Sequence, residues 1–126
     1  MMTMGNASGP RATIYQDPHC AVDFGLQKFW LDRRSVTLTR KEFELLSTLA
    51  ANAGEIVPRD QLLKSVWGYG PEIRTRTLDV HIRRLRRKLT PYGEQYIETI
   101  FGVGYRFQPW RESRAFSAPS ALRATA

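Results

Sequence analysis

The 126-residue sequence predicts an α+β fold in which a four-stranded antiparallel sheet is followed by three helices and a β-hairpin. Three observations predict this order. Short β-prone segments alternate with turn residues at first, apolar residues then recur at helical spacing, and two β-prone runs flank a Gly-Val-Gly turn. The domain is expected over residues 12–110. Residues 1–11 and 111–126 lack apolar periodicity, and we expect a disordered leader or linker and a disordered tail.

The predicted N-terminal sheet has four short strands, at residues 12–16, 20–24, 28–31 and 35–38. Turn-forming residues separate them: Asp17-Pro18, Gly25 and Asp32-Arg33. Spacing this short predicts an antiparallel meander. The candidates for its buried face are Val22, Phe24, Phe29, Leu31, Val36 and Leu38. Trp30 alternates out of phase with its neighbours, which leaves its burial open.

The first helix is predicted to begin after Thr39. Thr39 and Glu42 have the spacing of a capping box, and Leu38 and Phe43 flank it as a hydrophobic staple. The sequence Asn52-Ala53-Gly54 supplies the signal that ends the helix.

A second helix is predicted to start at Pro58, because proline suits the first helical position, and to stop at Gly68. Its apolar residues are Leu62, Leu63, Val66 and Trp67. Residues 68–73 contain two glycines and a proline, and we expect a loop there.

The third helix, expected at about residues 75–89 with Thr75 as its N-cap, carries most of the charge. Residues 74–88 hold seven basic residues and one acidic residue, so they contribute +6 of the chain's net charge of +7. Apolar residues recur here at intervals of four, three and four: Leu78, Ile82, Leu85 and Leu89. This stripe is predicted to pack on the core.

The opposite side of this helix presents Arg83, Arg84 and Arg87 around Val80, and we call these four residues the arginine face. A guanidinium group matches phosphate oxygens and the O6/N7 edge of guanine, and a valine suits a thymine methyl. Double-stranded DNA is therefore the predicted partner. The alternative is a surface helix with solvated arginines, but such faces usually mix signs. The one acidic residue here, Asp79, is expected to pair with Arg83.

Residues 96–107 predict a hairpin with a tight turn at Gly102-Val103-Gly104. This glycine pair is no dinucleotide fingerprint, because a third glycine and a following helix are missing. Helix, turn, helix, basic helix and hairpin is the order of a winged helix-turn-helix, whose last helix enters the major groove while the hairpin, or wing, contacts a flanking groove or backbone.

Other classes of function are disfavoured. Two histidines and one cysteine offer neither zinc spacing nor a catalytic set, so we expect no enzyme, metal or cofactor. The single Cys20 fits a reducing cytoplasm, and neither a membrane-length apolar run nor a signal peptide is found. A module for an acidic protein partner and an RNA-binding module stay as alternatives. The aromatic residues do not form the stacking face that single-strand recognition favours.

Four ordered motifs resemble the effector domain of OmpR/PhoB-type response regulators: LTRKEFELL (38–46), RDQLLxxVWG (59–68), RTLDVHIRRLRRKL (76–89) and YIETIFGVGYRF (96–107). The similarity covers roughly residues 12–108. It implies a bacterial transcriptional regulator of a two-component system that binds double-stranded DNA sequence-specifically in the cytoplasmic nucleoid. The family's receiver domain has no counterpart here, so we expect either an excised effector domain or a standalone regulator.

The resemblance also implies roles for single residues. Expected base contacts are Val80, Arg83, Arg84, Arg87 and, in the wing, Thr99. Expected backbone contacts are Arg59, Trp67, Arg74, Arg76, Thr77, His81 and Arg86. His81 has a second interpretation, as a boundary histidine packed on the sheet. Trp67 is expected to combine a buried ring with an indole N–H turned to a phosphate.

Further expectations follow from the resemblance. The loop at residues 68–73, with Tyr69 and Glu72, is similar to one that contacts RNA polymerase, the alternative being a plain connector. Relatives bind direct repeats as head-to-tail pairs, which implies a homodimer on DNA.

Two positions depart from the family. Phe101 replaces a basic wing residue and is expected to pack on sugars or close the hairpin on the core, and Pro58 replaces a serine cap.

Overall fold

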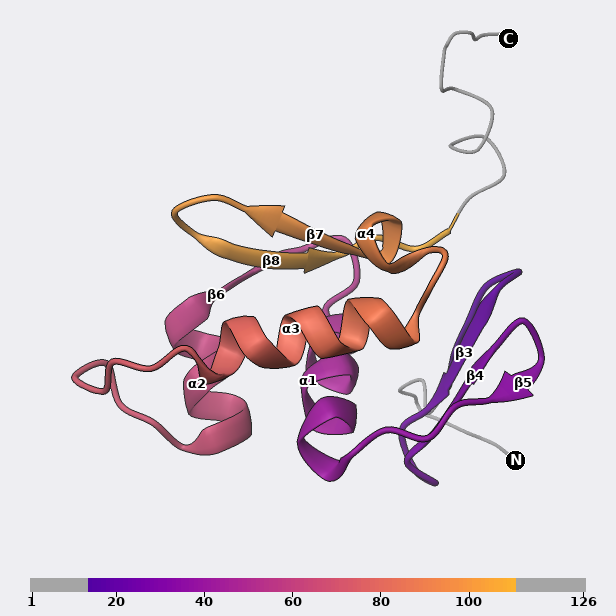
Figure 1. Ribbon diagram of the computed structural model, residues 1–126, viewed down its shortest axis with the longest axis horizontal. Coiled ribbons are helices and arrows are strands. Elements are labelled where there is room, and N and C mark those ends of the chain that lie inside the picture. Colours follow the sequence, from indigo (N-terminus) through magenta and orange to yellow (C-terminus); the bar gives the residue numbers. More distant parts are fainter. Residues whose placement is uncertain (1–13, 111–126) are drawn as a thin grey trace, which may run out of the picture.

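The computed structural model describes residues 14–110, and the leader and tail predicted at residues 1–11 and 111–126 lie outside this range. The elements in chain order are β2 (Ile14–Gln16), β3 (Cys20–Asp23), β4 (Lys28–Leu31), β5 (Arg34–Ser35), α1 (Arg40–Ala51), β6 (Ile56–Pro58), α2 (Arg59–Trp67), α3 (Thr77–Lys88), α4 (Gly93–Tyr96), β7 (Ile97–Ile100) and β8 (Gly104–Phe107). This is the predicted α+β winged helix-turn-helix. Its hairpin lies along α3, and the N-terminal sheet lies beyond the C-terminal end of that helix (Figure 1).

The N-terminal sheet has the predicted antiparallel order, β2-β3-β4-β5. Phe29 lies opposite Val22, and both side chains are buried, whereas Trp30 lies opposite Ala21 on the other face and is partly exposed. The fourth strand is shorter than predicted: it covers Arg34–Ser35 rather than residues 35–38. After it, the Val36 N–H still donates to the Phe29 carbonyl oxygen in β4, and the chain then turns toward the start of α1. The side chains of Val36 and Leu38 pack against the core.

The capping box of α1 is confirmed. The Thr39 hydroxyl accepts a hydrogen bond from the Glu42 N–H at 3.2 Å, and Glu42 Oε1 accepts one from the Thr39 N–H at 2.9 Å. The helix ends at the predicted place, with Asn52 as its C-cap. Local capping signals therefore predict both ends of this helix.

A strand before α2 was missed by the sequence analysis. β6 pairs with β8, so the wing is part of a three-stranded sheet of order β6-β8-β7. Pro58 is the last residue of β6 and the N-cap of α2, with an extended ψ of 151°, and the helix begins one residue later than predicted. Gly104 belongs to β8 rather than to the turn, and a Cβ there would lie 2.1 Å from the Val57 carbonyl oxygen. This close approach lets β6 pair with the wing.

The boundaries around α3 also differ from prediction. Its N-cap is Arg76 rather than Thr75, although the Thr75 hydroxyl accepts a hydrogen bond from the Thr77 N–H at 3.1 Å. The short helix α4 was not predicted, and it takes Tyr96 out of the hairpin, which starts at Ile97.

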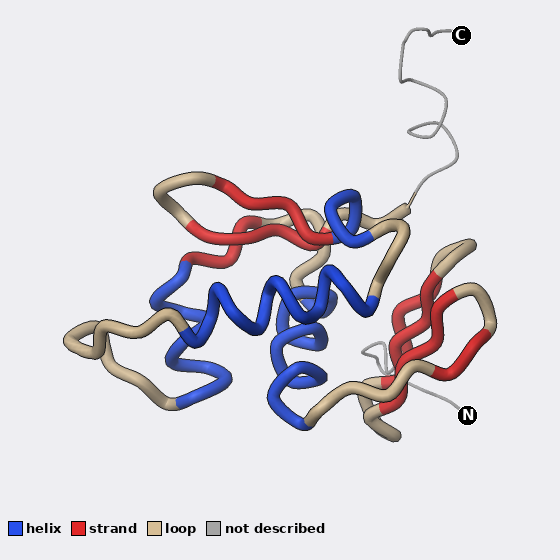
Figure 2. The backbone as a smooth tube through the Cα atoms, in the orientation of Figure 1, coloured by secondary structure: helices blue, strands red, loops and turns tan. Residues whose placement is uncertain are grey.

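The stripe on α3 is buried as predicted, with Leu78, Ile82, Leu85 and Leu89 each at most 2% exposed. It packs into one core with side chains from α1, α2 and the wing. The two sheets flank the helices on different sides (Figure 2). The stripe therefore fixes which side of α3 can meet a partner.

One carboxylate ties the N-terminal sheet to the end of the wing. Asp17, half-buried after β2, accepts hydrogen bonds from the Tyr96 hydroxyl at 2.7 Å and from the Trp110 N–H at 3.1 Å. It also accepts from the Tyr15 hydroxyl and from the N–H groups of His19 and Cys20. Segments far apart in sequence thus meet at a single side chain.

Candidate nucleic-acid interface

The arginine face of α3 is open to solvent. The side chains of Arg83, Arg84 and Arg87 are exposed and make no hydrogen bond or ion pair within residues 14–110, and Val80 is partly exposed among them. The buried leucine stripe on the opposite side prevents the helix from turning this face inward. Three unpaired guanidinium groups on a rigid helix form a surface suited to an anionic ligand.

Asp79 does not pair with Arg83, contrary to the expectation. Its carboxylate accepts from Arg59 Nη1 at 2.6 Å and from the Tyr105 hydroxyl at 3.0 Å. Burial alone raises the pKa of Asp79, but these two donors outweigh it and hold the pKa below its usual value. The pair joins the first turns of α2 and α3 to β8. Arg59, an expected backbone contact, thus has one of its nitrogens committed to Asp79.

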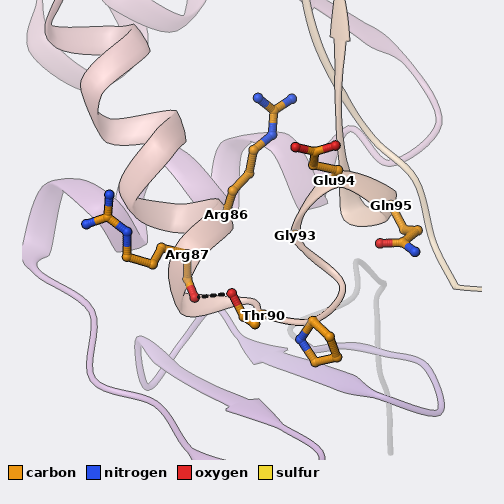
Figure 3. A pocket seen from close by; sticks show the side chains of 7 residues that line it. Arg86, Arg87, Thr90, Gly93, Glu94 and Gln95 are labelled. Carbon is orange, nitrogen blue, oxygen red and sulfur yellow. Dashed lines mark hydrogen bonds between the residues drawn. The ribbon is translucent and has the colours of Figure 1, made fainter.

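Arg86 turns away from the arginine face and holds the wing. Its Nε and Nη2 atoms donate to the Ile97 carbonyl oxygen at 3.1 and 2.7 Å, and Nη2 also bonds Thr99 Oγ1 at 2.7 Å. Figure 3 shows Arg86 and Arg87 leaving the end of α3 in different directions, beside a hollow also lined by Thr90 and Glu94. Arg86 and Thr99, both expected to contact DNA, are therefore hydrogen-bonded to each other.

Lys88, the last residue of α3, also binds other parts of the fold through its side chain. Its Nζ atom donates to Glu42 Oε1 at 2.6 Å and to the Thr37 carbonyl oxygen at 3.1 Å. Of the seven basic residues at 74–88, this leaves five whose side chains make no hydrogen bond or ion pair in the described part of the chain: Arg74, Arg76, Arg83, Arg84 and Arg87. All five are exposed.

His81 and Trp67 form one aromatic contact between α3 and α2, with ring centroids 4.9 Å apart and a T-shaped geometry. The His81 Nδ1–H donates to the Thr77 carbonyl oxygen at 2.8 Å, because that oxygen can only accept. His81 thus packs at a boundary, but on α2 rather than on the sheet as expected. Both rings are partly exposed beside the first turn of α3, where Thr77 lies.

The loop between α2 and α3 is largely exposed. Gly68 caps α2 with a φ of +75°, and residues 71–74 are exposed, Glu72 and Arg74 among them. Tyr69 is partly buried and packs against the core. The loop therefore exposes one acidic and one basic side chain, and Tyr69 anchors it to the core.

Phe101 does not close the hairpin on the core, which corrects one of the two interpretations given for it. It lies in the turn between β7 and β8 and is 90% exposed, and its neighbour Val103 is 45% exposed. The Arg59 N–H donates to the Val103 carbonyl oxygen at 3.0 Å, so the turn is attached to the start of α2.

Sequence reasoning missed the contacts that position this surface. Arg59 and Asp79 are 20 residues apart, and Glu42 and Lys88 are 46 apart. No local spacing rule reaches that far, so the charge pattern offered no signal for either pair. Within residues 14–110, no cluster of His, Cys, Asp and Glu is placed to hold a metal ion, and no helix is long and apolar enough to cross a membrane.

Comparison with known proteins gives one family. The family model described as "Transcriptional regulatory protein, C terminal" matches residues 33–107. The transcriptional regulatory protein HprR of Escherichia coli (strain K12) is 52% identical over 77 residues, which cover 60% of this chain and 34% of HprR. The response regulator ArlR of Staphylococcus aureus (strain Mu50) is 39% identical over 97 residues, which cover 76% of this chain and 44% of ArlR. The chain thus spans less than half the length of these curated relatives.

Two of the solved structures that match this fold are described as DNA-binding domains. The DNA-binding domain of RstA from Klebsiella pneumoniae, solved in complex with the RstA box, has a TM-score of 0.70 and 33% identity, and the match covers 79% of this chain and all of that one. The DNA-binding domain of CpxR from E. coli also has a TM-score of 0.70, with 30% identity over 78% of this chain and 98% of that one.

Proposed function

The chain belongs to the OmpR/PhoB-type family of response-regulator C-terminal domains, and we propose that it binds double-stranded DNA in a sequence-specific manner to regulate transcription. The observation that carries the proposal is the arginine face. Three exposed guanidinium groups surround Val80 on a helix whose other side is fully buried. Such a helix fits the major groove, where arginine matches guanine edges.

In this proposal some residues contact DNA bases and recognise the sequence, and others contact the DNA backbone and position the domain. Base contacts come from Val80, Arg83, Arg84 and Arg87, and from Thr99 in the wing. Backbone contacts come from Arg74, Arg76, Thr77, His81 and Trp67, which surround the first turn of α3. Phosphate contacts supply most of the affinity and make it depend on salt, while each good base contact contributes about 1–3 kcal/mol of discrimination.

Arg59 and Arg86 have a double role in the proposal. Arg59 links the turn of the wing to α3, through its N–H on Val103 and its Nη1 on Asp79, and Arg86 holds β7. Each keeps guanidinium N–H groups that could reach a phosphate. Their primary contribution is to fix the distance between the wing and the arginine face. This distance must match the spacing between the two grooves that the wing and α3 contact.

Three wider roles are part of the same proposal. The chain acts as the effector of a two-component system in the bacterial cytoplasm, at the nucleoid. The exposed loop with Tyr69 and Glu72 contacts RNA polymerase. On direct repeats, two copies bind head to tail. The family and the exposure of the loop support these roles.

Selection from a random duplex library tests the central claim. The selected duplex and a scrambled duplex are then titrated over a range of salt, with single-stranded RNA and an acidic protein as competitors. We expect tight binding to the selected duplex and affinity that falls steeply with salt. Equal affinity for both duplexes, or displacement by the RNA or the acidic protein, would refute sequence-specific DNA binding.

A further inference from the structure

Two adjacent arginines lie in solvent on the turn between β4 and β5, outside both α3 and the wing. Arg33 and Arg34 are exposed, and their side chains make no hydrogen bond or ion pair within residues 14–110. We call these two residues the turn arginines. Because a guanidinium group is always charged, two of them on adjacent residues attract an anionic partner.

The turn arginines are held in a fixed place. Asp32 and Arg33 are the central residues of a two-residue hairpin turn and have positive φ angles of +50° and +69°, as a type I′ turn requires. The Asp32 carboxylate binds His19 Nδ1 at 2.6 Å and accepts from the Tyr92 hydroxyl at 2.9 Å. Asp32 offsets part of the local positive charge, but both of its oxygens are bonded within the fold. The turn therefore loses little conformational freedom when a partner binds.

Arg34 lies beside the C-terminal end of α3. It pairs across the ladder with Leu31, so both side chains point to the same face of the sheet, and Leu31 is buried in the core on that face. Arg34 and Thr90 line one hollow, and Thr90 and Arg87 line another. Figure 3 shows Thr90 next to Arg87 at the end of α3. The basic surface of α3 therefore continues past Thr90 to the turn arginines.

The two ends of α3 have different neighbours. The turn of the wing lies near its start, because Arg59 donates to Val103 through its N–H and to Asp79 through Nη1. The N-terminal sheet lies beyond its C-terminal end (Figure 1). The 12 residues of α3 span about 18 Å, whereas the major groove is about 12 Å wide. A helix of this length laid across the groove reaches the phosphates at its edge.

We infer that the turn arginines bind phosphates of the DNA backbone that borders the major groove at the C-terminal end of α3, on the side away from the turn of the wing. The inference deepens the proposed function and rests on it. Charge complementarity and continuity with the arginine face support it. Phosphate contacts release counterions and carry no sequence information, so this contact adds affinity that falls with salt and is the same for every flanking sequence.

Three duplexes test the inference. The long one carries the sequence selected by the wild-type domain with both flanks, and each of two short ones lacks one flank. On the long duplex, Arg33→Gln/Arg34→Gln should lower the slope of log affinity against log salt by about two units. The advantage of wild type over this variant should therefore shrink about tenfold between about 50 and 200 mM salt. On one short duplex the two proteins should have the same slope, because the phosphates that the turn arginines contact are missing.

Two further variants separate a phosphate contact from other effects. Arg33→Lys/Arg34→Lys keeps both charges and should retain the wild-type slope on the long duplex. Lys28→Gln is the matched control for Arg34→Gln, since each removes one exposed positive charge from β4 or β5, and Lys28 lies at the end of β4 away from the turn. Arg34→Gln should lower the slope by about one unit, whereas Lys28→Gln should leave it unchanged. Melting temperatures should match wild type, because all three side chains lie in solvent.

Several outcomes would overturn the inference. One is an unchanged slope for Arg33→Gln/Arg34→Gln on the long duplex, and another is the same reduction on all three duplexes or in Lys28→Gln. Self-association without DNA that the double variant abolishes, measured by sedimentation, would assign the turn arginines to a second copy of the chain. These results leave the proposed function intact, because wild type still selects and binds its duplex. Failure of wild type to bind any duplex would instead refute the proposed function.

Discussion

Glu42 in the first turn of α1 and Lys88 at the end of α3 form an ion pair with 2.6 Å between Oε1 and Nζ, although Glu42 is only 2% exposed. The same carboxylate oxygen accepts from the Thr39 N–H in the capping box of α1. A residue that begins one helix therefore fixes the end of the helix that carries the arginine face.

Replacement of Lys88 by methionine should destabilise the fold by about 2–4 kcal/mol, because a buried carboxylate loses its counter-charge. Urea unfolding measures the free energy. Lys64→Met is the matched control, since Lys64 is exposed at the end of α2, and it should change stability by less than about 0.5 kcal/mol. Similar small effects for both variants would show that Lys88 adds little to the fold.

Stability should fall in acid. Burial raises the pKa of Glu42 and of Asp17, but the donors around each outweigh burial and hold both pKa values below their usual range. A carboxyl group with a lowered native pKa stabilises the fold above its unfolded pKa, about 4 for Asp and Glu, and loses that contribution as the pH falls through the native pKa.

The free energy of unfolding, measured by urea titration at each pH, should therefore be nearly level around neutral pH and decline below about pH 4. Glu42→Gln should be less stable at neutral pH and should show a shallower acid decline, because one of the titrating groups is gone. Stability that rises on acidification would contradict the assignment.

Arg84→Ala and Arg76→Ala should separate base contacts from phosphate contacts. Arg84→Ala should weaken binding mainly to the selected duplex, by about 1–3 kcal/mol, whereas Arg76→Ala should weaken binding to selected and random duplexes alike and lower the salt slope by about one. Titrations on both duplexes provide the measurement. Lys28→Ala, on the N-terminal sheet, is the control that should change little. Equal losses on both duplexes for both arginine variants would rule out this division.

Arg86→Ala should loosen the wing. The bonds from Arg86 to the Ile97 carbonyl oxygen and to Thr99 are lost, at a cost of about 1–3 kcal/mol. Backbone amides of β7 and β8 should then exchange hydrogen faster, and affinity should fall on every duplex. Arg83→Ala, the neighbouring exposed arginine, should lower affinity without changing exchange. Unchanged exchange in Arg86→Ala would mean that the wing is held by other contacts.

Features set by neighbouring residues were predictable from the sequence. The capping box at Thr39 and Glu42 is a spacing of three residues, and the buried stripe of α3 is a helical repeat, so both follow from local geometry. The arginine face follows from the same repeat, because it is the side opposite the stripe.

Features set by distant partners were not predictable. Val57 lies in a three-residue strand whose partner, Tyr105, comes 48 residues later, and Pro58 beside it looked like a helix start. Asp79 was assigned to Arg83 by helical spacing, but Arg59 and Tyr105 are its partners in the fold. The charge pattern likewise could not reveal that the Arg86 guanidinium donates hydrogen bonds to Ile97 and Thr99 in the wing.

The hydrogen bond from the Trp110 N–H to Asp17 joins the end of the described chain to the turn that follows β2. Tension applied through either terminus would be borne first by this carboxylate and the strands beside it. Within residues 14–110, none of the hydrogen bonds to Asp17 comes from a residue of α3, so a load on this carboxylate does not act directly on the arginine face.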